Sequence, residues 1–382
     1  MKKNFHWLLV VLALLAGVRP AFSQAALGIA YTNHQAILFW PTNASGTNSL
    51  LLSATNLTTP NWLAATDAVP FNFRTNIALA VTNNTLAARF FRLSLIPPTL
   101  DNMVLIPAGA FTIGDALDGE SDAIPTASVY VSGFYMDVNL VTSNQWAAVY
   151  AYAIGQGYGF VDQGAAKAGN HPVISVDWYD CIKWCNARSQ QAGLAPVYFS
   201  DTNFTLPYTN GESTNVFVNW TNSGYRLPTE AEWEKAARGG LSGQRFPWGL
   251  TISWNQANYF GNPGAFSYDL ATGTSYDPAY ATGSLPYTSP VGSFPANGFG
   301  LRDMSGNVIE WCWDWYAASP YPAGSPYLGG TDPHGAGPAS GSRVLRGGYW
   351  DNYANLARTS NRFFNLPVHA NIYFGFRCVR KF

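Results

Sequence analysis

The stretch from Asn297 to Trp315, NGFGLRDMSGNVIEWCWDW, constrains the fold more than any other part of the chain. It combines a glycine-rich turn, three carboxylates and several aromatic side chains. Calcium favours an oxygen-rich, turn-shaped cage, and a glycine permits the tight backbone that such a cage needs. One interpretation is therefore a hard-cation site formed by Asp303, Gly306, Val308 and Glu310. The other is a buried aromatic turn in which Glu310 only accepts hydrogen bonds from neighbouring amides.

The first 23 residues have the features of a secretory signal peptide. Lys2 and Lys3 precede an apolar run from Trp7 to Gly17, and small residues occur at positions 21–23, where a peptidase requires them. The apolar run is short for a membrane span, and no later stretch is apolar enough to cross a bilayer. We therefore expect an exported protein, secreted or periplasmic, with no membrane span.

The composition excludes one class of partner and several classes of catalyst. The net charge is −1 with only 11% charged residues, so the chain has no basic stripe for nucleic acid. Aromatic residues make up 15% of the chain, which indicates a loop-rich globular fold with an aromatic core. The sequence contains no G-x-S-x-G, no H-E-x-x-H, no Walker A motif and no dinucleotide-binding fingerprint.

Four cysteines in an exported chain predict disulfides. Cys181 and Cys185 lie four residues apart on a predicted helix, and their parallel side chains suit two separate partners better than each other. Cys312 and Cys378 are the available partners. A zinc site is the alternative, but two cysteines at this spacing on a helix match no common zinc motif.

The chain divides into a signal peptide (1–23), a small module (24–98) and a large domain (99–382). In the module, short apolar runs alternate with Asn-, Thr- and Pro-rich turns, which predicts a small antiparallel β-sandwich. In the large domain, residues 103–115 read as one alternating strand that runs into a glycine turn, and residues 129–141 as a pair of strands.

Three helices are expected from their capping residues. Thr142 with Gln145 forms a capping box, Asp177 caps the segment that follows it, and Thr229 with Glu232 forms a second capping box. Residues 241–296 are rich in Gly, Pro, Tyr and Ser, and a long ordered loop of this kind is usually functional or held by a metal.

Several landmarks stand in a fixed order from about residue 102 to the end of the chain. They are MVLIPAGAFTIGD, FYMDVNLVTSNQW, HPVISVDWYDCIKWCNARS, YRLPTEAEWEKAARGG, FPWG, NGFGLRDMSGNVIEW, RVLRGGYWDN and GFRCVR. Together they closely resemble the sulfatase-modifying-factor family, whose founding activity is formylglycine generation. The resemblance implies an α+β fold, a variant of the C-type-lectin-like fold with little regular secondary structure.

The resemblance also implies two calcium sites and a disulfide. It supports the first site at Asp303, Gly306, Val308 and Glu310. A second site falls at Asn258, Tyr259, Asp277 and Ala279. It favours a Cys185–Cys378 disulfide, which leaves Cys181 to pair with Cys312.

The catalytic residues of the family are not present at the matching positions of this sequence. Formylglycine-generating enzymes bind copper(I) with two cysteines that follow the RGGS motif, and here those positions are Asn352 and Ala357. The motif serine is Tyr349, and the first Trp of the usual W-E-W is Ile309. Copper(I) needs soft thiolate ligands, which an amide and a methyl group cannot replace. Copper is therefore not expected, and authentic formylglycine generation is not expected either.

What remains is a candidate ligand pocket next to the former catalytic positions. Aromatic faces with short amides and a carboxylate suit a sugar or a peptide. The alternative is that Trp350 and Tyr353 belong to the core. The pocket residues are Tyr349, Trp350, Asp351, Asn352, Tyr353, Asn355, Arg358 and Arg362.

Three functions are consistent with these residues. The first is a calcium-stabilised domain that binds a peptide, protein or glycan, and the second is a divergent oxidoreductase of the same family that acts on an exported substrate. The third is a structural or adhesive surface protein. The missing cysteines favour the first and third, and the polar aromatic loop favours the first over the third.

Overall fold

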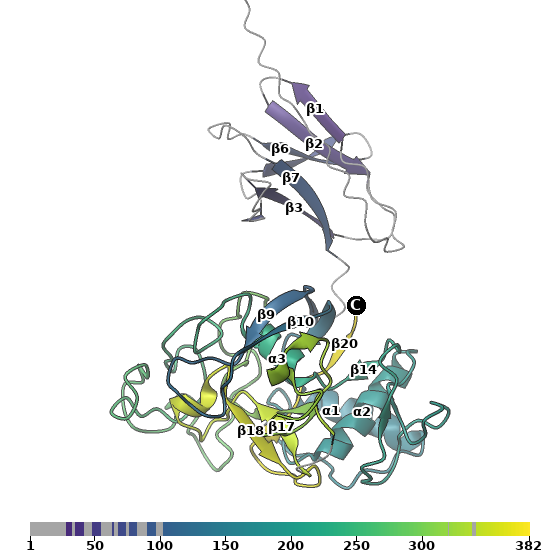
Figure 1. Cartoon of the computed structure of the whole chain (residues 1–382), viewed down its shortest axis with the longest axis vertical. Coiled ribbons are helices and arrows are strands. Elements are labelled where there is room, and N and C mark those ends of the chain that lie inside the picture. The colour runs from purple at the N-terminus through teal and green to yellow at the C-terminus, as the bar shows by residue number, and fades with distance from the viewer. Residues whose placement is uncertain are drawn as a thin grey trace, which may run out of the picture. The chain divides into compact units, whose positions relative to one another are not determined.

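A computed structural model describes residues 102–319, 321–337 and 341–382, together with strands between residues 28 and 96. The chain divides into two compact units, Met1–Pro98 and Thr99–Phe382, which are coloured along the chain in Figure 1. The predicted signal peptide, residues 1–23, lies outside the described residues.

The described strands of the first unit form two antiparallel sheets, with orders β1-β2-β6-β5 and β4-β3-β7. Two antiparallel sheets are what a small all-β sandwich requires. The strands are β1 (Gly28–Thr32), β2 (Gln35–Pro41), β3 (Asn48–Ala54), β4 (Leu63–Ala64), β5 (Ala68–Phe73), β6 (Asn76–Val81) and β7 (Phe90–Ile96).

The second unit is an α+β domain in which most strands are short, as the sequence predicts. Its described sheets have the orders β14-β20-β11-β8, β18-β17-β15-β19, β16-β10-β9 and β12-β13. The strands are β8 (Met103–Ile106), β9 (Gly109–Ile113), β10 (Ala127–Val131), β11 (Phe134–Asp137), β12 (Tyr198–Phe199), β13 (Phe217–Val218), β14 (Tyr225–Arg226), β15 (Ile309–Trp315), β16 (Gly330–Thr331), β17 (Arg343–Arg346), β18 (Arg362–Asn365), β19 (Phe374–Gly375) and β20 (Val379–Lys381).

The three helices begin at the predicted caps. Both capping boxes form, at Thr142 before α1 (Ser143–Gly155) and at Thr229 before α3 (Glu230–Ala237). Asp177 caps α2 (Trp178–Gln191) by accepting a hydrogen bond from the Asp180 amide. Helices α1 and α2 lie side by side in Figure 1. Most of α2 is buried, including polar residues, so it runs through the core rather than along the surface.

Strand β15 separates two parts of the core. Successive residues of a strand point to opposite faces, so Trp311 packs with the α2 side chains while Cys312 packs with the side chains of α3. The stretch that opened the sequence analysis therefore becomes a central strand with a core cluster on each face.

One expectation about the strands was wrong. Residues 103–115 do not form a single strand but two, β8 and β9, which belong to different sheets. The break falls at Pro107, which has no amide hydrogen to donate, and β9 then begins at Gly109, whose φ is +151°. The next two strands are divided in the same way, since β10 pairs with β9 and β11 pairs with β8.

The segment from 241 to 296 contains no helix and no named strand, although the structure describes all of it. It is held by hydrogen bonds from its backbone to neighbouring loops. Within the described residues, none of the helices has the length and apolar character needed to cross a bilayer.

Candidate functional site

Glu310 lies at the centre of the domain, where the sequence places a metal ligand. Its side chain is fully buried, and Arg377 donates to it twice, through Nε at 2.7 Å and Nη2 at 3.0 Å. Burial raises the pKa of the Glu310 carboxyl, while the Arg377 charge opposes that rise. The sequence analysis did not assign a role to Arg377, although the GFRCVR motif contains it. The positive charge of Arg377 compensates the negative charge of the Glu310 carboxylate whether or not a cation is present.

Asp303 offers a better test of the predicted metal site. Its Oδ2 accepts a hydrogen bond from the Gly292 amide at 2.6 Å, but its Oδ1 is buried without a partner. Burial raises the pKa of the Asp303 carboxyl to about 6. The backbone has φ values of +57° at Asp303 and +75° at Gly306, so the segment forms the irregular turn that the sequence predicts.

Asn307, inside this turn, joins three segments that are far apart in the sequence. Its amide donates to the carbonyl of Asn258 at 2.8 Å, and its carbonyl accepts from the Trp350 amide at 3.0 Å. Its side chain exchanges two hydrogen bonds with the backbone of Ser289, at 3.0 and 3.2 Å. The turn is therefore the anchor of the 241–296 loop. A Cβ at Gly306 would lie 2.3 Å from the Asn258 carbonyl oxygen, so only glycine fits there.

The second predicted metal segment meets the first at this contact. Asn258 is buried and donates its side-chain amide to the Tyr287 carbonyl at 2.8 Å. The Tyr259 carbonyl already accepts from the Trp254 indole at 3.2 Å. Asp277 accepts from the Ala279 amide through Oδ1 at 3.0 Å, and its Oδ2 is buried without a partner.

One oxygen at each position is chemically suited to calcium. Each segment contains one carboxylate oxygen, on Asp303 and on Asp277, that is buried and lacks a hydrogen bond. An unmatched anionic oxygen in the interior is costly unless a cation or a proton reaches it, and oxygen donors are those that calcium prefers. Both calcium sites remain predictions, with these two oxygens as their structural support.

The positions of the family's copper ligands have a different role here. The Asn352 side chain accepts a hydrogen bond from the Tyr349 amide at 3.2 Å. The backbone carbonyl of Asn352 accepts a second one from the Phe260 amide at 2.9 Å. Ala357 is fully buried, and its carbonyl accepts from the Ser305 hydroxyl at 2.9 Å. Both residues therefore support the local backbone, and neither offers a soft ligand.

Next to these positions lies a group of half-buried residues that we call the aromatic surface: Tyr276, Tyr287, Tyr349, Asp351 and Tyr373. Tyr349 stacks on Tyr373 with ring centroids 4.3 Å apart, and Tyr276 and Tyr287 meet edge to face at 5.0 Å. The Tyr373 hydroxyl donates to Asp351 at 3.3 Å. Burial, together with a hydrogen bond to Asp351, raises the pKa of Tyr276 to about 12.

The structure brings only part of the predicted pocket to this surface. Trp350 is only 1% exposed and packs below Tyr276 and Tyr287, so it belongs to the core. Tyr353 is 45% exposed, and its ring meets Phe260 edge to face. Asn355 is partly buried, and its side-chain oxygen has no hydrogen-bond partner.

The two predicted pocket arginines do not face a ligand. Arg358 is buried and lies 3.3 Å from the Asp122 carboxylate. Arg362 is buried and donates to both oxygens of Glu230, at 2.6 and 2.9 Å. Their charges are compensated inside the protein, so the expectation that they contact a ligand does not fit their environment.

The cysteines are all buried, and two of them meet. The sulfur atoms of Cys185 and Cys378 lie 3.5 Å apart without a bond between them, so the favoured pairing stays a prediction. Cys181 packs in the same core cluster, whereas Cys312 packs in the cluster on the other face of β15. The structure therefore does not bring Cys181 and Cys312 together, and the pairing of those two has no support.

Three tyrosines of the aromatic surface were missed from the sequence. Tyr276 and Tyr287 lie in the long loop, and Tyr373 lies in the turn before β19. The loop had been singled out as functional, but tyrosines are so common in this chain that nothing marked these three. Tyr276 and Tyr373 both form hydrogen bonds with Asp351, a contact between segments far apart in the sequence that only the folded domain reveals.

Comparison with known proteins gives a consistent result. The model of the sulfatase-modifying factor enzyme 1-like domain matches residues 94–382. The chain is 35% identical to the chaperone protein LppX of Paenibacillus barcinonensis, over 68% of this chain and 82% of that protein. It is 32% identical to the formylglycine-generating enzyme of Streptomyces coelicolor, over 74% of this chain and 90% of that enzyme. Variable protein 1 of Treponema denticola has a similar structure, with a TM-score of 0.55 and 25% sequence identity. The match covers 82% of this chain and 99% of that protein.

Proposed function

Since the chain belongs to the sulfatase-modifying factor enzyme 1-like family but has Asn352 and Ala357 in place of the catalytic thiols, we propose that it is an exported, calcium-stabilised binding domain for a peptide or glycan. The observation that carries this proposal is the aromatic surface, in which one carboxylate lies among four half-buried tyrosines. Similarity to LppX, a protein described as a chaperone, supports a binding role.

The chemistry of the aromatic surface defines the kind of ligand. Tyrosine rings offer flat apolar faces and hydroxyl groups, which suit sugar rings and peptide side chains alike. Asp351 is partly exposed and forms hydrogen bonds with Tyr373, at 3.3 Å, and with Tyr276, and its two oxygens retain capacity to accept a further hydrogen bond from a ligand. A ligand with hydroxyl or amide donors next to an apolar face satisfies both requirements.

The first experiment tests whether the catalytic activity of the family is absent. Purified mature protein is incubated with copper(I), oxygen and a Cys-x-Pro-x-Arg peptide, and mass spectrometry is used to look for the aldehyde. We expect no aldehyde, because the thiolates are absent. Aldehyde formation would show that the protein is an oxidase, and the binding proposal would then be wrong.

The second experiment identifies the ligand. The mature protein is applied to glycan and peptide arrays beside the variants Tyr349→Ala and Asp351→Asn. We expect each variant to weaken binding roughly tenfold, which corresponds to about 1.4 kcal/mol. Tyr130→Ala is the control, since Tyr130 is an exposed tyrosine on β10 that does not belong to the aromatic surface. Equal binding by all four proteins would exclude the aromatic surface as the site.

A further inference from the structure

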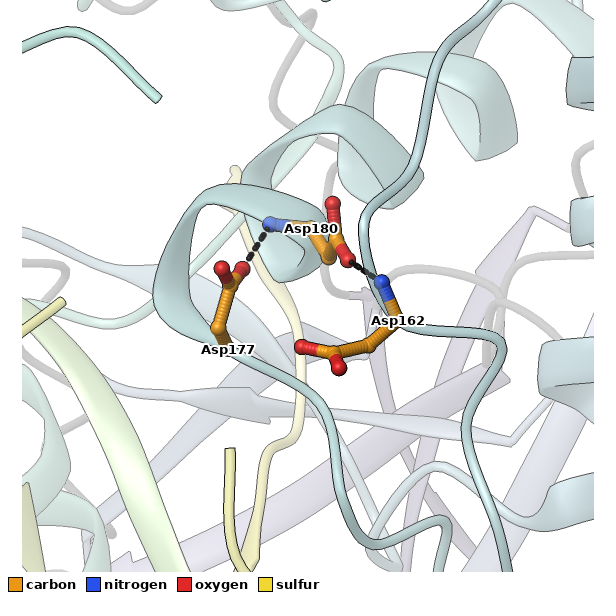
Figure 2. Close-up of side chains that lie close together, drawn as sticks. All are labelled: Asp162, Asp177 and Asp180. Carbon is orange, nitrogen blue, oxygen red and sulfur yellow. Dashed lines mark hydrogen bonds between the residues drawn. The ribbon is translucent and has the colours of Figure 1, made fainter. Parts of the chain in front are cut away.

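Three aspartates meet where α1 and α2 lie side by side. Asp177 caps α2, Asp180 lies in its first turn, and Asp162 lies in the loop that follows α1. Their ligand atoms all lie within 4.8 Å of one another. Figure 2 shows the three side chains converging from the helix and the loop. We call these residues the α2 aspartate cluster.

One oxygen of the cluster has no partner. Asp180 accepts from the Asp162 amide at 2.6 Å and pairs with Lys183 at 2.6 Å. Asp177 accepts from the Asp180 amide through Oδ1 at 2.6 Å (Figure 2). The Asp177 Oδ2 is buried and has no hydrogen-bond donor, and the Asp177 side chain is 0% exposed. An acidic group on a solvated surface would meet water, but this oxygen does not.

The charges of the cluster do not balance. Lys183 is the one cation that pairs with it in the described structure, and it is also fully buried. A further carboxylate, Glu212, lies within hydrogen-bonding reach of Asp177. Carboxylates this close cannot all remain ionised without added positive charge. Either a proton or a metal cation must therefore occupy the space between Asp177 and its neighbours.

We propose that the α2 aspartate cluster binds a hard divalent cation, for which calcium is the probe. Carboxylate oxygens from Asp162, Asp177 and Asp180 are the donors that such an ion prefers, and Asp177 Oδ2 is free to take it. This site shares no residue with the aromatic surface or with the two calcium positions that the family resemblance implies.

The test counts calcium ions bound per chain in the mature full-length protein, by equilibrium dialysis with radioactive calcium. Asp177→Asn removes a charge but preserves the helix cap, because Asn and Asp are equivalent N-cap residues. We expect this variant to bind one calcium fewer than the wild-type protein. Glu120→Gln is the control, since it removes one charge from a partly buried carboxylate outside the cluster and should bind as many calcium ions as the wild type.

A second variant separates this site from the family positions. Asp303→Asn should also lose calcium, and the double variant Asp303→Asn/Asp177→Asn should lose one more equivalent than Asp303→Asn alone. If Asp177→Asn does not fold, Asp162→Asn takes its place, because Asp162 is only partly buried. Unchanged stoichiometry in a folded variant would mean that a proton occupies the cluster, and the proposal would be overturned. Failure of the array experiment would leave this result unaffected.

Discussion

Two regions of the domain bury several charges each, but they differ in balance. Around α3, Arg238 pairs with Glu234 at 2.6 Å and Arg362 pairs with Glu230 at 2.6 Å, while Arg346 also binds Glu234. At the α2 aspartate cluster, three carboxylates meet one lysine. Asp177, Asp180 and Lys183 are as fully buried as the ion pairs around α3, so the main difference between the two regions is charge balance. A balanced network supports the fold by itself, whereas an unbalanced one requires a proton or an ion from solution.

The largest expected effect comes from breaking the balanced network. Glu230→Ala leaves the buried Arg362 without its carboxylate, and removal of one partner of a buried pair costs about 3–5 kcal/mol of unfolding free energy. Urea unfolding followed by tryptophan fluorescence measures the loss, and Glu120→Gln is the control, because Glu120 lies 4.0 Å from Arg358 with its side chain 39% exposed. A loss below about 1 kcal/mol, as for a surface pair, would show that water reaches Arg362.

The next effect concerns calcium at the turn that contains Asp303 and Glu310. Chelation should lower the melting temperature of the mature protein and calcium should restore it, because a ligand at 100 times its Kd stabilises by about 2.7 kcal/mol. In Glu310→Ala, much of this response should disappear. The change on chelation is compared within each protein, since the variant also leaves Arg377 unpaired. If the chelator leaves the melting temperature of the wild-type protein unchanged, both calcium positions implied by the family resemblance are contradicted.

A pH-dependent effect, measured per pH unit, follows from Asp314, at the edge of the balanced network. Burial, and then the charge of Glu230, raises the pKa of Asp314 to about 8. The folded protein therefore holds a proton that the unfolded chain releases near pH 4, and stability falls as pH rises from about 4 to 8. The slope for one proton is about 1.4 kcal/mol per pH unit. Asp314→Asn should flatten this part of the profile in urea unfolding, and an unchanged slope would mean that Asp314 is ionised.

The smallest effect has the opposite sign and sharpens the comparison. In calcium-free buffer at neutral pH, Asp177→Asn should raise the unfolding free energy by about 1 kcal/mol, because it relieves repulsion between buried carboxylates. The same kind of substitution, loss of one negative charge, would thus stabilise one region and destabilise the other. If Asp177→Asn destabilises the calcium-free protein, the α2 aspartate cluster is balanced in a way that Lys183 alone does not explain.

Much of the fold could be predicted because local signals and tertiary structure agree. Thr142, Asp177 and Thr229 cap the helices that their sequences indicate. The strands near residue 107 were harder, because periodicity within one segment does not reveal which sheet a strand joins. The ordered motifs supplied the family, which a single pattern would not have done.

The site was less predictable because it depends on long-range contacts. Asp177 was assigned only as a helix cap, since nothing in its neighbourhood indicates that Asp162 lies beside it. Arg362 was assigned to the pocket because it is close to it in sequence, although Glu230 holds it in the core. Cysteine pairing by elimination failed for a similar reason, because it ignores which face of β15 carries Cys312.

The hydrogen bonds of Asn307 have a thermodynamic consequence. The same residue holds the turn that contains Asp303 and the loop that carries Tyr276 and Tyr287, so the two cannot change shape independently. An ion at the turn and a ligand on the tyrosines would then be linked. Each would change the affinity of the other by the same factor, because coupling free energy is reciprocal. Ligand affinity measured at two calcium concentrations would therefore report on the metal as well as on the ligand.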